Sequence, residues 1–155
     1  MTIADQAYSA GPDAITIASV DREHSDFVLV AAIRRQVFVE EQGVAEAEEW
    51  DGLDVSSRHL LARRGNEPLG TLRYYGDEGW LHVGRVAVLP VARGLGLGRL
   101  LLADCLRRGA EKGFTRSFLN AQTDKTGFYE KLGYHTVGDM FMEAGIPHIR
   151  MERYW

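Results

Sequence analysis

Apolar positions recur along this chain with two different periods. Over residues 25–38 they return every three or four positions, which predicts an amphipathic helix capped by Asp21 or Ser25. Helical composition returns over about 96–112 and 124–132. Short runs rich in β-branched and aromatic residues instead predict strands at 15–17, 58–64, 69–75, 80–88, 117–121, 134–137 and 148–154.

The order of these elements predicts the fold class. Turn residues at Gly65–Pro68 and Gly76–Gly79 join the three middle strands into an antiparallel meander, and strands and helices alternate after it. We therefore expect an α+β fold with a mixed central β-sheet of about six to seven strands flanked by about four helices. With 155 residues, the chain is expected to form a single domain, 14–155, after a loose tail, 1–13. The acid-rich segment 40–51 is either loop or short helix.

Three alternating glycines stand between a predicted strand and a predicted helix, in Arg93-Gly94-Leu95-Gly96-Leu97-Gly98. Glycines let the backbone approach a ligand closely. The N–H groups of a helix N-terminus, together with the helix dipole, stabilise a phosphate. This stretch therefore predicts a site for a phosphorylated ligand.

Spacing separates the glycine stretch from two nucleotide-binding loops. A P-loop requires Lys-Ser or Lys-Thr after the last glycine, and neither follows here. The dinucleotide fingerprint Gly-x-Gly-x-x-Gly requires a third glycine where this chain has Arg99 or Leu101. Another kind of phosphate site is therefore expected.

Composition disfavours several classes of partner. The chain is 45% hydrophobic and 26% charged with a net charge of −4, which is ordinary for a globular domain and unfavourable for nucleic acid or an acidic membrane. No apolar run approaches the ~20 residues of a membrane span, and residues 1–13 lack a signal-peptide pattern. The single cysteine, Cys105, cannot form an internal disulfide, so we expect a cytoplasmic setting and a packed, non-catalytic thiol.

Several motifs resemble those of the GCN5-related N-acetyltransferases, the GNAT superfamily. Arg93-x-x-Gly96-x-Gly98 resembles the family's acyl-CoA loop, and 128–134 (Phe-Tyr-Glu-Lys-Leu-Gly-Tyr) resembles its Phe-Tyr-x-x-x-Gly-Phe/Tyr signature. Other segments are similar to the ElaA-like subgroup: 35–42, 48–51, 121–122 and 143–148. The resemblance implies the GNAT fold and direct transfer of an acetyl group from acetyl-CoA to a primary amine of a small molecule or peptide. It implies no metal, and family members are often homodimers.

The resemblance also implies a cofactor site. The pantetheine arm would lie along the strand before the glycines, where a bulge near Gly84 would free backbone groups and an N–H near Val88 would stabilise the oxyanion. The loop would hold the pyrophosphate. The residues expected to contact acetyl-CoA are Val86, Ala87, Val88, Arg93, Gly94, Leu95, Gly96, Leu97, Gly98, Arg99, Asn120 and Phe128.

Two residues are expected to move protons. The family places the tyrosine at Tyr129 near the thioester sulfur, where its hydroxyl would act as general acid. His82 lies eleven residues before Arg93, where some members carry a catalytic glutamate on this strand, and a histidine suits proton transfer at neutral pH. Other bases remain open: a water chain, or Glu40, Glu41, Asp51, Glu143 and His148.

The acceptor is open as well. The residues expected to contact it are Glu41, Arg73, Glu143 and His148. The acids Glu46, Glu48 and Glu49 are typical of a solvated face, but would favour a cationic amine if they lined the cleft. Arg73 would instead favour an acidic group on the acceptor.

Two alternatives to catalysis stay open on the sequence. One is a non-catalytic acyl-CoA-binding or sensing module. The other is a subunit of an interaction complex, in which Trp50, Trp80 and Trp155 would contact the partner.

Overall fold

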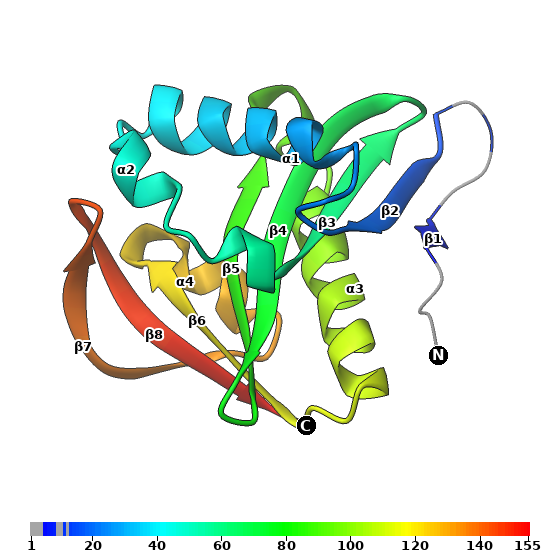
Figure 1. The fold of residues 1–155 in the computed structure, drawn as a ribbon. Coiled ribbons are helices and arrows are strands. Elements are labelled where there is room, and N and C mark those ends of the chain that lie inside the picture. The colour runs from blue at the N-terminus through cyan, green and yellow to red at the C-terminus, as the bar shows by residue number, and fades with distance from the viewer. Residues whose placement is uncertain (1–4, 9–10, 12) are drawn as a thin grey trace.

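The computed structural model describes residues 5–8, 11 and 13–155, and within them eight strands form one sheet in the order β1-β2-β3-β4-β5-β6-β8-β7 (Figure 1). Only β5 and β6 pair in parallel; the other neighbours are antiparallel. The strands are β1 (Gln6–Ala7), β2 (Ile15–Val20), β3 (Arg58–Arg64), β4 (Glu67–Asp77), β5 (Trp80–Val88), β6 (Arg116–Gln122), β7 (His135–Glu143) and β8 (Ile146–Tyr154). The predicted α+β class with a mixed sheet is confirmed, with more strands than the six to seven expected.

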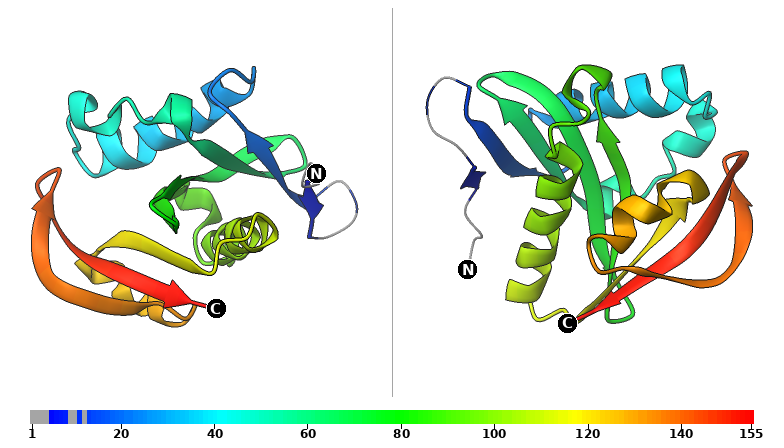
Figure 2. Two further views of the ribbon diagram at one scale, coloured as in Figure 1. Left: turned by 60° about the horizontal axis from the view of Figure 1, so that its bottom comes forward. Right: turned by 180° about the vertical axis from the view of Figure 1, so that it is seen from behind.

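Helices cover both faces of the sheet (Figure 2). On one face α1 (Phe27–Arg34) runs on as a π-helical segment, Arg35–Glu41, and is followed by α2 (Glu46–Glu49). On the other face lie α3 (Leu97–Glu111) and α4 (Thr126–Glu130). Short 3-10 turns occupy Asp54–Ser56, Pro90–Ala92 and Thr123–Lys125. Each face therefore has its own apolar core against the sheet.

The first helix begins later and ends later than its apolar period predicts. Asp26 stands at its N-cap position and makes no capping hydrogen bond through its side chain. Asp21 instead accepts from the N–H of Glu23, and so the predicted cap was wrong. The π-helical segment carries the helical path on to Glu41. Such wide turns are frequent at functional sites.

A split between β5 and β6 is the main opening in the sheet. The two strands pair only over Leu81–Val83 and Ser117–Leu119, and they diverge beyond these residues. On its other side β5 carries one extra residue opposite β4, and Arg85 there has φ of +53°. The predicted bulge is thus present, with the left-handed residue at Arg85 rather than at Gly84. It leaves the β6-facing edge of β5 free over its last residues.

Parts of the expected tail are tied to the domain. Residues Gln6–Ala7 pair with Thr16 and Ile17, and the Tyr8 hydroxyl donates to Asp104 at 2.8 Å. The remaining tail positions, 1–4, 9, 10 and 12, lie outside the described residues.

Three further expectations concern the helices and the ends of the chain. Burial raises the pKa of the Cys105 thiol, which disfavours the reactive thiolate and agrees with a packed cysteine. The C-terminal Trp155 is 41% exposed, and its N–H donates to the Thr115 carbonyl. Among the described helices, none combines the length and apolar character that crossing a membrane requires.

Candidate active site

A cavity of about 1120 Å³ fills the split between β5 and β6. We call one end the loop end, lined by Arg93, Gly94, Gly96, Gly98, Arg99 and Lys125. We call the other the hairpin end, lined by Glu48, Glu49, Asp51, Arg73, Arg85, Glu143 and His148. Tyr129, Asn120 and His82 also line the cavity. The split in the sheet therefore connects two regions of different chemistry.

Backbone conformation shapes the loop end. Gly94 and Gly96 have φ of +83° and +78°, in the left-handed region that favours glycine, and Gly96 is the N-cap residue of α3. A Cβ on Gly98 would come within 3.3 Å of the Phe128 ring. No side chain caps this helix and no acidic residue stands in its first turn. Its first N–H groups are therefore open to an anionic ligand.

The cations at the loop end differ in their partners. Arg99 is exposed and has no carboxylate partner within the part of the chain that the structure describes. Arg93 is occupied: it donates to both carboxylate oxygens of Glu41 at 2.7 Å, and its Nε donates to the Val88 carbonyl at 3.0 Å. This pairing lowers the pKa of Glu41, which stands outside the cavity lining. Lys125 lines the loop end, a residue that the sequence analysis missed.

Tyr129 lies on α4 and packs edge-on against Phe128 and Tyr134. Burial raises the pKa of its hydroxyl to about 12, so the group is protonated at neutral pH. Within the described residues the hydroxyl makes no hydrogen bond, and the Tyr129 side chain lines the cavity. It is therefore free to donate a proton or a hydrogen bond to a bound ligand.

His82 lines the cavity from β5 between two aromatic rings. Its ring stacks on Phe118 at 4.2 Å and tilts against Tyr75 at 4.7 Å between centroids. Burial, and then the charge of Arg73, lowers its pKa to about 4. Its Nδ1 is buried without a hydrogen-bond partner among the described residues. The ring is therefore neutral at pH 7 and holds a proton weakly.

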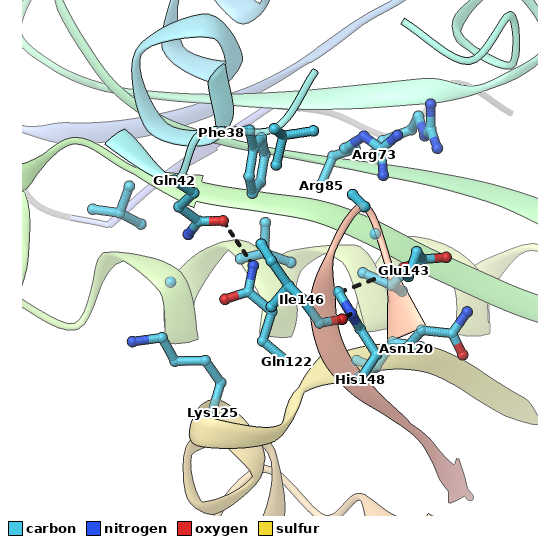
Figure 3. A pocket seen from close by; sticks show the side chains of 18 of the residues that line it. Phe38, Gln42, Arg73, Arg85, Asn120, Gln122, Lys125, Glu143, Ile146 and His148 are labelled. Carbon is cyan, nitrogen blue, oxygen red and sulfur yellow. Dashed lines mark hydrogen bonds and ion pairs between the residues drawn. The ribbon is translucent and has the colours of Figure 1, made fainter. Parts of the chain in front are cut away.

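Two glutamines meet across the cavity, as Figure 3 shows. Gln122 at the end of β6 donates to the side chain of Gln42, just after the π-helical segment, at 2.8 Å. Neither residue was predicted to contribute to the site. They lie 80 positions apart, and so spacing carries no signal of their contact.

A buried ion cluster forms the floor of the hairpin end. Its members are Arg34, Arg73, Arg85, Glu49, Asp51 and Asp54. Arg34 is fully buried and binds Glu49 at 2.7 Å and Asp54 at 2.6 Å. Glu49 is only 2% exposed, so the expected solvated face is wrong for this residue. Three arginines and three carboxylates thus neutralise one another, with Arg34, Arg73 and Glu49 buried and the side chains of Asp51 and Arg85 still 27% and 21% exposed.

The cluster ties α2 to the bulge of β5. Arg73 donates to both Asp51 oxygens at 2.8 Å, and Arg85 donates to the Glu49 carbonyl and to Asp51 at 3.2 Å. Burial raises the pKa of Asp51, but the hydrogen bonds and charge of Arg73 outweigh it and hold the value at about 2. Burial dominates at Glu49 and raises its pKa despite the arginines.

The hairpin between β7 and β8 completes this end. Glu143 and His148 face each other there, with 3.5 Å between Glu143 Oε2 and His148 Nε2 (Figure 3). The structure thus brings together three of the four residues expected at the acceptor, Arg73, Glu143 and His148, and leaves Glu41 outside the lining. Two of the expected cofactor contacts are also outside it: Ala87 is in the core and Leu95 is exposed.

Comparison with known proteins relates the chain to one family. A family model described as an acetyltransferase (GNAT) domain matches residues 21–154. The Bacillus subtilis (strain 168) protein YyaT is 40% identical over 126 residues, which cover 78% of this chain and 84% of that protein.

Two solved structures share the fold along most of their length. An acyl-CoA N-acyltransferase from Pseudomonas aeruginosa superposes with a TM-score of 0.80 at 30% identity, covering 90% of this chain and 99% of that one. Escherichia coli ElaA superposes with a TM-score of 0.79 at 26% identity, covering 90% of this chain and 99% of that one.

Proposed function

The chain belongs to the GNAT acetyltransferase family, and we propose that it moves an acetyl group from acetyl-CoA to a primary amine of a small molecule or peptide. The observation that carries this proposal is the cavity itself. It runs from an uncapped helix N-terminus, through the split beside β5, to a neutral tyrosine hydroxyl. GNAT folds bind acetyl-CoA, and an elongated phosphorylated thioester fits such a path.

The loop end is proposed to hold the pyrophosphate. The first N–H groups of α3 and the guanidinium of Arg99 would bind it, with Lys125 as a second cation. Arg93 is proposed to contribute from a fixed position, since Glu41 and the Val88 carbonyl already hold its guanidinium. The edge of β5 that β6 leaves unpaired would pair with the pantetheine amides at Val86 and Val88, where the Val88 carbonyl already accepts from Arg93 Nε, with Asn120 and Phe128 beside it.

Four tasks remain once the thioester is placed. The amine must lose a proton, its nitrogen must bond to the acetyl carbon, the oxyanion must be stabilised and the C–S bond must break. We propose a backbone N–H near Val88 as the oxyanion donor and Tyr129 as the acid that protonates the departing thiolate. Burial keeps the Tyr129 hydroxyl protonated at neutral pH, so a proton is available to donate, although a pKa of about 12 makes it a weaker acid than one whose pKa lies near the working pH.

We propose His82 as the general base because of its position in the cavity, not because of its pKa. His82 lines the cavity on β5 and is neutral at pH 7, so it is able to accept a proton. Its pKa of about 4 makes it weaker than the ideal base, whose pKa lies near the working pH. A proton taken by His82 would therefore pass on quickly to solvent. If His82 is the base, His82→Gln lowers kcat at neutral pH. The variant then matches wild type at a pH above the acceptor's own pKa, where a base is no longer needed.

The direct test of the proposed function is a thiol-release assay. Purified protein is incubated with acetyl-CoA and polyamines, amino sugars, aminoglycosides or lysine peptides, and the free thiol is measured over time. Acceleration by at least one amine, with the acetylated amine identified by mass, is the expected result. Tight CoA binding with no acceleration by any acceptor would contradict it and favour the non-catalytic acyl-CoA-binding module.

A further inference from the structure

The β7–β8 hairpin holds two side chains at fixed places in the cavity (Figure 3). Its turn residues Ala144 and Gly145 have φ of +52° and +74°, the left-handed pair of a tight two-residue hairpin. Glu143 directly precedes the turn. His148 lies opposite Gln122 of β6, and its ring stacks on Phe141.

The Glu143 carboxylate and His148 Nε2 lie side by side at the cavity. His148 Nδ1 lies 2.7 Å from the Ile146 carbonyl, and because a carbonyl only accepts, Nδ1 carries the hydrogen. In the neutral ring, Nε2 then has a lone pair that faces the Glu143 carboxylate at 3.5 Å. The His148 side chain is only 9% exposed, and Nε2 receives no hydrogen bond from the described residues. An ammonium group placed here would donate to both acceptors.

Nearby arginines do not offer a site for an anionic acceptor. Carboxylates already engage the guanidinium groups of Arg73 and Arg85 in the buried ion cluster. By contrast, the carboxylates of Glu48 and Glu143 line the cavity and have no lysine or arginine partner within the described part of the chain. The hairpin end therefore carries an excess of negative charge over a balanced floor, which favours a cation.

We propose that the acceptor is a small α,ω-diamine, held at one end as an ammonium between Glu143 and His148 while its other amine reacts in the split. This inference rests on the acetyltransferase function proposed for the same cavity. Phe38 and Ile146 line the cavity with apolar surface that suits methylene groups. The reacting nitrogen loses a proton and bonds to the acetyl carbon as the C–S bond breaks. The anchored nitrogen keeps its charge and takes no part in the chemistry.

A matched pair of acceptors tests the charge requirement. 1,4-Diaminobutane and 1-butylamine have the same carbon chain and differ in the second amine. We expect kcat/KM to be about tenfold or more higher for the diamine, as for a charge-assisted hydrogen bond gained. Equal values for the two amines would overturn the proposal. Preference for a lysine peptide over both would also overturn it, since it would place the acceptor class among peptides.

Variants separate anchoring from chemistry. Glu143→Gln keeps the side-chain shape and removes the charge, and we expect it to raise KM for 1,4-diaminobutane about tenfold, so that the preference for the diamine over butylamine falls by a similar factor. His148→Phe keeps a ring and removes Nε2, and we expect it to lower the same preference. Glu23→Gln is the control: it removes the same charge from an exposed residue outside the cavity lining. Equal loss with both amines would overturn the anchoring role.

Calorimetry keeps this inference apart from the proposed function. With CoA present, 1,4-diaminobutane is expected to bind wild-type protein and Glu23→Gln alike, and Glu143→Gln about tenfold more weakly. This pattern without turnover would support the diamine site while contradicting the transferase. Turnover of other amines, without diamine binding, would overturn the diamine site alone.

Discussion

The two ends of the cavity are built in different ways. The loop end comes mainly from one continuous stretch, the end of β5 and the start of α3, to which the turn after β6 adds Lys125, and its chemistry lies mainly in backbone N–H groups. The hairpin end draws on α1, α2, β4, β5 and the β7–β8 hairpin, and its chemistry lies in charged side chains that pair across long sequence distances. A site formed by local backbone can be predicted from a sequence motif. A site formed by charged side chains from distant segments can be recognised only once the fold is known.

The largest effect is expected from breaking the hairpin end. Arg34→Ala leaves Glu49 and Asp54 buried without their shared partner, and removing one member of a buried pair costs about 3–5 kcal/mol. Urea denaturation measures the loss. The matched change at the loop end, Arg99→Ala, is expected to stay within about 0.5 kcal/mol, since Arg99 is exposed and has no carboxylate partner among the described residues. Equal losses would contradict the difference drawn between the two ends.

Tyr129→Phe tests the proposed general acid. The variant keeps the ring that packs against Phe128 and Tyr134 and removes only the hydroxyl. We expect kcat to fall about a hundredfold, at the lower limit for a lost general acid, with the dissociation constant of CoA unchanged. Stopped-flow thiol release and calorimetry measure the two quantities. A variant that retains full kcat would remove Tyr129 from the mechanism.

Gly96→Ala tests the backbone of the loop end. A left-handed backbone with φ of +78° costs a residue with a Cβ about 1–2 kcal/mol, although the space around this atom is open. We expect a lower melting temperature and weaker CoA binding, because relief of the strain would reorient the N–H groups at the start of α3. Gly127→Ala serves as the control, since its Cβ also meets open space and its φ is not left-handed. Unchanged CoA affinity in Gly96→Ala would show that this conformation is dispensable.

A further prediction concerns pH. His82 has a folded pKa of about 4, below its unfolded value near 6.5, so the unfolded chain binds more protons between these values. Stability therefore falls as the pH drops through this window, by at most about 1.4 kcal/mol per pH unit from this residue. His82→Phe is expected to flatten the decline. An unchanged slope between wild type and variant, measured by denaturation at each pH, would show that the ring is not buried as described.

Much of the fold follows from local patterns. The strands over Arg58–Arg64 and Trp80–Val88 match the apolar runs that predict them, and α3 begins one residue from its expected start. The β7–β8 hairpin was harder to predict from the sequence. Because β7 is exposed along nearly its whole length, it has no alternation of apolar and polar residues. The π-helical segment likewise cannot be predicted from an apolar period of 3.6 residues.

The candidate site likewise has parts that the sequence predicted and parts that it did not. The glycine loop and Tyr129 stand in contiguous motifs, and the cavity reaches both. The roles of Glu49 and Arg73 depend on partners 15 to 36 positions away, and an acid-rich stretch alone resembles a solvated surface. Arg93 matched the loop motif, yet its pairing with Glu41 joins residues 52 positions apart. Long-range ion pairs decide these roles, and a single sequence carries no signal for them.

Calorimetric titration of CoA into three proteins tests the central claim that the cavity binds the donor and the acceptor at chemically separate ends. Wild type and Glu143→Gln are expected to bind CoA with the same affinity. Arg99→Ala is expected to bind it about tenfold more weakly, with a weaker dependence on salt, because one charge-assisted contact to the pyrophosphate is lost. Unchanged affinity in Arg99→Ala, or an equal loss in Glu143→Gln, would contradict the account.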